Sequence, residues 1–82
     1  MAAVRYYFDQ RDWDGLSVDD EGIELHSLDA VQKEASNSIA TALREALRWP
    51  IRPGQISIEV RDEKGQVMCI RFSIEMEIGR KN

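Results

Sequence analysis

The chain has few of the residues that build disulfide scaffolds, metal sites or catalytic triads. Its 82 residues include one cysteine, Cys69, and one histidine, His26. A lone cysteine cannot form an internal disulfide, and one cysteine with one histidine cannot complete a four-ligand zinc site. We therefore expect a single domain over residues 1–82 that folds by packing alone or completes its core with a second copy.

Long apolar runs are also missing. No segment approaches the roughly 20 consecutive apolar residues of a membrane-spanning helix, so we expect no membrane association. The first five residues contain no basic segment followed by an apolar stretch, and we expect no signal peptide. Together with the free thiol, this pattern predicts a cytoplasmic protein.

An excess of positive charge is the third absence. The formal net charge is −4, and residues 1–30 contain eight acidic residues against two basic ones. A net acidic chain repels the phosphate backbone of nucleic acids at long range. The composition therefore argues against nucleic acid as the main partner.

The first 25 residues show the two-residue period of β-strands. Val4, Tyr6 and Phe8 alternate with more polar residues, which predicts a strand. An Asp-Gly pair at positions 14 and 15 indicates a tight turn, and Leu16 and Val18 then suggest a short returning strand. After a second turn, residues 23–25 are expected to run extended toward a helix.

One helix is predicted from Leu28 to Arg48. Apolar residues recur there every three or four positions as far as Leu47, which gives one apolar face. Ser27 is the expected N-cap, and Pro50 prevents the helix from continuing. We expect the apolar face to pack on a sheet and the opposite face to contact water.

The second half of the chain predicts a hairpin. Ile56, Ile58 and Val60 alternate with polar residues, residues 62–65 form the turn, and apolar residues alternate again from Met68 to Ile78. The predicted fold is α+β with the order β-β-α-β-β. It comprises a four-stranded, mainly antiparallel sheet with one long helix packed on one face.

The two strands of this hairpin have unequal predicted lengths. The first covers seven residues, 55–61, and the second covers thirteen, 66–78. Either the helix or the first strand covers the apolar side chains of the overhang, or a second subunit does so. We favour the second subunit and predict a homodimer.

No pattern in the sequence indicates catalysis. Asp12, Asp14, Gly15 and Glu21 match part of a calcium-loop spacing, but the first ligand position is Gln10 and the flanking segments read as strands. No nucleophile–base pair accompanies His26. We therefore predict no enzyme activity, no cofactor and no metal site.

These observations favour a non-enzymatic protein-interaction module that self-associates through the sheet edge or the open sheet face, with an unidentified protein as a further partner. The candidate interaction residues are Tyr7, Cys69, Arg71, Ser73, Ile74, Met76 and Ile78. The alternative is a small nucleic-acid-associated regulator or antitoxin-like partner that uses the basic end of the helix, with Arg44, Arg48 and Arg52.

Several short motifs resemble a known family. The opening strand Arg5-Tyr6-Tyr7-Phe8-Asp9 is followed by the Asp-Gly turn and by a second turn that leads into Ile23-Glu24-Leu25. With the helix entry Leu28-Asp29-Ala30 and the closing hairpin, they resemble short bacterial proteins classed as a domain of unknown function. The resemblance implies no activity, and members of that family often stop or look helical after the position of Phe72.

Overall fold

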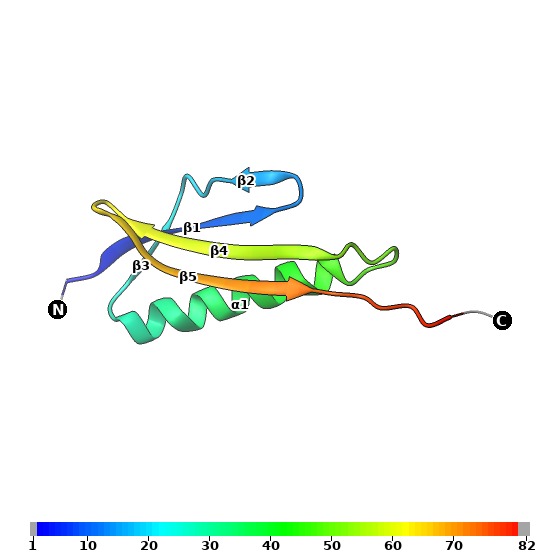
Figure 1. The fold of residues 1–82 in the computed structure, drawn as a ribbon. Helices are drawn as coiled ribbons and strands as arrows, with labels where there is room; N and C mark the ends of the chain where they lie inside the picture. Colours follow the sequence, from blue (N-terminus) through cyan, green and yellow to red (C-terminus); the bar gives the residue numbers. More distant parts are fainter. Residues whose placement is uncertain (1, 81–82) are drawn as a thin grey trace.

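The computed structural model describes residues 2–80, in which one helix covers one face of an antiparallel sheet (Figure 1). This arrangement confirms the predicted α+β class and the single long helix. The elements are β1 (Val4–Asp12), β2 (Gly15–Ser17), β3 (Ile23–Leu25), α1 (Leu28–Ala46), β4 (Gly54–Asp62) and β5 (Gly65–Ile74).

The sheet has five strands, one more than predicted. Its order is β2-β1-β4-β5, and β3 also pairs with β1. Both β2 and β3 lie along the same edge of β1, β2 beside residues 10–12 and β3 beside residues 4–6. The segment expected only to be extended is therefore a strand, because the second turn brings it back to the part of this edge that β2 leaves free.

Local sequence signals explain where α1 begins and ends. The Ala30 N–H donates to Ser27 Oγ over 3.1 Å, which caps the helix as predicted. The helix ends at Ala46, two residues before the predicted Arg48. Its last turn closes when the Leu47 N–H donates to the Leu43 carbonyl and the Arg48 N–H to the Glu45 carbonyl.

The core lies between α1 and the two central strands. Val31 and Ala35 are fully buried on the helix, and the largest fully buried side chains of the sheet come from one face of β4, namely Ile56, Ile58 and Val60. Each such aliphatic side chain contributes about 1.5–3 kcal/mol on burial. The ends of the predicted apolar face lie outside this core, since Leu28 is 60% exposed and Leu47 is 49% exposed.

The final hairpin differs from its predicted form. β4 has nine residues and β5 has ten, and the register shifts between Val60 and Arg61 because β5 has one extra residue there, Val67, so the two strands are almost equal in length. Ile74 pairs with Gly54, the first residue of β4, and no residue of β4 remains to pair with residue 75. The prediction of a thirteen-residue final strand was therefore wrong.

Residues 75–80 have no regular secondary structure and lead away from the sheet beyond the end of β5 (Figure 1). The described chain is elongated, with extents of 63 × 22 × 17 Å. Among residues 2–80, no helix is both long and apolar enough to cross a bilayer.

Candidate interaction surface

Strand β5 forms the outer edge of the sheet. It pairs with β4 on one side, and no strand among residues 2–80 pairs with its other side. In the ten residues from Gly65 to Ile74, the only charged side chain is Arg71. β5 therefore presents a long, nearly uncharged row of backbone hydrogen-bonding groups.

The seven predicted interaction residues occupy three different environments. Cys69, Arg71 and Ser73 lie on β5 opposite Glu59, Ser57 and Gln55 of β4. These β5 residues share the sheet face that α1 leaves open, and we refer to it as the open face. Tyr7 is also on the open face but lies in β1, so β4 separates it from β5.

The other three predicted residues are apolar. Ile74 is only 8% exposed and belongs to the core, so it is not part of the accessible surface of one chain. Met76 and Ile78 follow the end of β5 and are 44% and 76% exposed. Phe72, which the sequence did not single out, is 43% exposed on the helix-covered face of β5.

A buried carboxylate on the open face is the main feature that the sequence analysis missed. Asp9 is 6% exposed, and Arg61 Nε donates to its Oδ2 over 2.9 Å. The Asp19 N–H donates to Asp9 Oδ1, also over 2.9 Å. The Arg61 guanidinium additionally lies 4.4 Å from the centre of the Tyr7 ring and donates to the Asp19 carbonyl.

Asp19 holds the loop between β2 and β3 against β1. Its carboxylate accepts hydrogen bonds from the backbone N–H groups of Phe8, Glu21 and Gly22. Partial burial alone would raise its pKa, but these three donors and the nearby Arg61 charge lower the pKa below its ordinary value. The Asp9–Arg61–Asp19 cluster is thus a clamp in which both oxygens of Asp9 have donors.

A second ion pair extends along the open face toward β5. Arg11 Nε donates to Glu59 Oε2 over 2.7 Å, and the Ser57 hydroxyl donates to the same oxygen. The hydrogen bond from Arg11 lowers the pKa of Glu59 below its ordinary value. Because Glu59 lies directly opposite Cys69, the free thiol has a carboxylate as its cross-strand neighbour.

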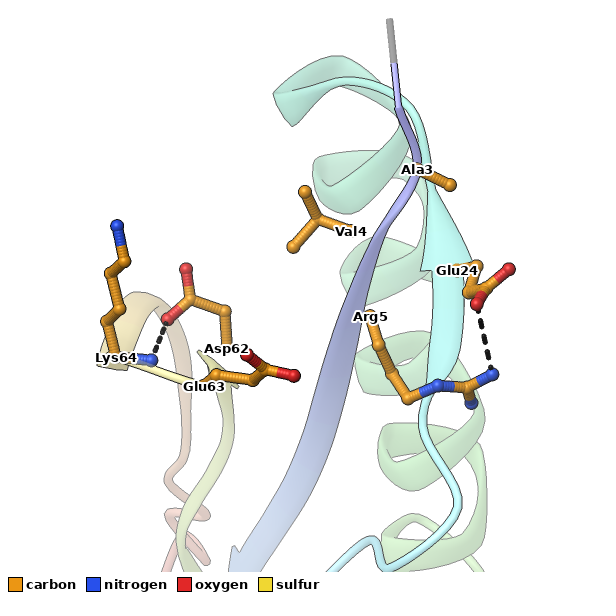
Figure 2. Close-up of a pocket in the computed structure, with 7 residues that line it drawn as sticks. All are labelled: Ala3, Val4, Arg5, Glu24, Asp62, Glu63 and Lys64. Atoms are coloured by element: carbon orange, nitrogen blue, oxygen red, sulfur yellow. Dashed lines mark hydrogen bonds and ion pairs between the residues drawn. The ribbon is translucent and has the colours of Figure 1, made fainter.

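A cavity lies at the far end of the sheet, between the start of β1 and the β4–β5 turn (Figure 2). Its volume is about 490 Å³, and its apolar lining residues are Ala3 and Val4. Arg5 pairs with Glu24 on one side over 3.4 Å, while the turn residues 62–64 form the other side. The cavity combines both charge signs, so its charge does not select a ligand.

The structure does not assemble the partial calcium pattern. Asp12 Oδ1 accepts the Asp14 N–H, while Asp14 Oδ1 lies 3.7 Å from Arg52. Within residues 2–80, no group of three His, Cys, Asp or Glu side chains is placed to hold a metal ion. Trp13, from the same turn, donates from its indole nitrogen to the Pro53 carbonyl over 2.7 Å and packs on Gly54.

The basic residues near the end of α1 are partly paired with acids. Arg48 lies 3.4 Å from Glu45, and the Arg52 guanidinium lies 4.9 Å from the centre of the Trp13 ring. Arg44 is exposed in the last turn of the helix. These three arginines therefore do not form one unpaired basic patch.

Together, these features define a class of small α+β domains in which one helix covers one face of an antiparallel sheet. Within that class, the chain belongs to the family described as a domain of unknown function (DUF6894), whose model matches residues 5–73. This membership confirms the predicted family of unknown function. The comparisons with curated proteins and with solved structures gave no match.

Proposed function

We propose that this protein is a non-enzymatic interaction module that self-associates through the outer edge of β5. The observation that supports the proposal is the edge strand itself, which has ten residues, a single charge and no proline. Natural sheets usually protect such edges with charges, prolines, bulges or very short strands. β5 has one bulge, near its beginning, and most of its length is left regular.

The exposed apolar side chains around β5 support the same proposal. Phe72 on β5 is 43% exposed, and Met76 just after the strand is 44% exposed. A second copy that pairs with β5 would remove these side chains from water and satisfy the free backbone groups at once. Interfaces below about 1,200 Å² are typically weak, and pairing through one strand edge is a small contact, so we expect dissociation constants in the micromolar range.

The absence of enzyme activity remains part of the proposal. Asp9 is the most buried carboxylate of the described chain, but Arg61 and the Asp19 N–H occupy both of its oxygens. A carboxylate whose two oxygens are both engaged inside the fold is not presented to a substrate as a general base. The free thiol of Cys69 is consistent with a cytoplasmic location, which we also propose.

Light scattering over a range of micromolar concentrations tests the self-association. We expect the apparent mass to rise from the 9.4 kDa of one chain toward twice that value. Phe72→Glu is expected to keep the protein monomeric, because it places a charge at the proposed edge. Val18→Glu is the matched control, since Val18 is 60% exposed and follows β2 at the opposite edge of the sheet.

Circular dichroism of each variant establishes that the fold is retained before the masses are compared. A wild-type protein that stays monomeric at all concentrations would refute the proposal. So would equal effects of the two glutamate substitutions. The nucleic-acid alternative remains a prediction, and DNA binding that weakens steeply with added salt would favour it.

A further inference from the structure

The apolar side chains around the end of β5 are arranged symmetrically about Phe72. At every second position from 68 to 76, the order along the chain is Met, Ile, Phe, Ile, Met, and the first four of these residues lie on the helix-covered face. The first four of these positions lie in β5, and the fifth is the second residue after it. This row of five apolar residues has the same order of residue types from position 68 to 76 as from 76 to 68.

Such a row has a direct consequence for pairing with a second copy. In an isologous dimer, a two-fold axis perpendicular to the sheet makes two edge strands antiparallel and keeps the helices of both subunits on one face. Directly opposed residues of antiparallel strands point to the same face. Because side chains alternate between the two faces along a strand, opposed residues must lie an even number of positions apart in the sequence. The two-fold axis therefore passes next to one residue, and that residue lies directly opposite the same residue of the second copy.

We propose that two copies of this chain pair through β5 and residues 75–76, with Phe72 opposite the partner's Phe72. This inference rests on the proposed self-association and adds its register. On the helix-covered face, Met68 then faces the partner's Met76, and Ile70 faces the partner's Ile74. On the open face, Cys69 faces the partner's Glu75, and Arg71 faces the partner's Ser73.

This register accounts for three features of the single chain. Phe72 is half exposed because its cover is the same side chain of the second copy. Met76 has no strand of its own chain beside it, and the register places it against the partner's Met68. Charge is also compatible, because the partner's Glu75 lies on a diagonal from Arg71, within reach of a long side chain.

Shifted registers fit less well. Centring the axis on Arg71 would oppose the two guanidinium groups of the dimer, which is unfavourable for like charges directly across a sheet. Centring it on Ile70 would leave Met76 without an opposing apolar residue, since its partner position would be Lys64 in the β4–β5 turn. Centring it on Ser73 would also oppose apolar residues, but the exposed Phe72 would then face the partner's Ile74, which is already buried in its own chain, whereas the centre at Phe72 covers each exposed Phe72 with the other.

Disulfide trapping measures the register directly. The native Cys69 serves as one reporter, and Glu75→Cys, Arg71→Cys and Glu77→Cys each add a second cysteine at an exposed position. Only the Glu75→Cys variant is expected to form covalent dimers in high yield under mild oxidation, because position 75 faces the partner's Cys69. The wild-type protein is expected to give little covalent dimer, since its two cysteines would lie about six residues apart along the strands.

Mixing two variants of opposite charge tests the register independently. Phe72→Glu and Phe72→Lys are each expected to be monomeric alone and to associate when mixed, because each charge then faces the opposite one. Highest trapping with Arg71→Cys or Glu77→Cys would overturn the register, since these variants report axes at Ile70 and Ser73. A dimer by light scattering that no variant traps would also overturn it, whereas a monomeric wild-type protein would overturn the proposed function itself.

Discussion

Removing the Arg61 guanidinium is expected to destabilise the fold more than its position at the sheet surface suggests. The side chain of Asp9 is 8% exposed and that of Arg61 is 36% exposed. In Arg61→Met, the Asp9 carboxylate keeps the Asp19 N–H but loses its counter-charge. Leaving a fully buried charge unpaired lowers the free energy of unfolding by about 3–5 kcal/mol. Water can reach Asp9 past the partly exposed residue 61, so we expect a loss of about 2–3 kcal/mol for Arg61→Met.

The control uses the same substitution on the same face. Arg11→Met breaks the Arg11–Glu59 pair, in which the Arg11 side chain is 53% exposed, and is expected to destabilise the fold much less than Arg61→Met. Asp9→Asn combined with Arg61→Met should be more stable than Arg61→Met alone, since the amide needs no counter-charge. Urea unfolding measures all four proteins. Equal stabilities of the two arginine variants would refute the reasoning.

Two further predictions concern turns and acid stability. Gly54→Ala should cost about 2–5 kcal/mol and shift the fluorescence of Trp13, because the new Cβ would lie 2.9 Å from Trp13 Cδ1 and φ is +145°. Gly65→Ala, with φ +132° and open space around its Cβ, should cost only about 1–2 kcal/mol and leave the fluorescence unchanged. The pKa of Asp19 is lower in the folded than in the unfolded protein. Ionised Asp19 therefore adds to the free energy of unfolding above about pH 4, and this stabilisation is lost as the pH falls through the folded pKa. Unfolding free energies measured against pH should therefore fall less steeply in acid for Asp19→Asn than for the wild-type protein, and parallel curves would contradict this.

Features that depend on neighbouring residues could be predicted from the sequence. The start of α1 follows from the Ser27 cap, and the alternation in the central strand identifies Ile56, Ile58 and Val60 as core residues. The end of β5 could not be predicted in the same way. Apolar alternation continues to Ile78, but the strand ends where β4 supplies no further partner, at Gly54.

The Asp9–Arg61 clamp was missed for a related reason. Asp9 follows an aromatic run on a strand, and its neighbours in sequence do not include its ion-pair partner. Its partner lies 52 residues away, and the contact depends on the register of β1 against β4 and on the loop containing Asp19. A carboxylate in the middle of a strand, on the same face as Tyr7, is the one signal that pointed to a buried ion pair.

Amide hydrogen exchange of β5 at several protein concentrations tests the central claim most directly. If a second copy pairs with the outer edge of β5, exchange at residues 68–76 should slow as the concentration rises through the micromolar range. Exchange in β2, at the opposite edge of the sheet, should not depend on concentration. Exchange of residues 68–76 that is equally fast at every concentration would contradict the account.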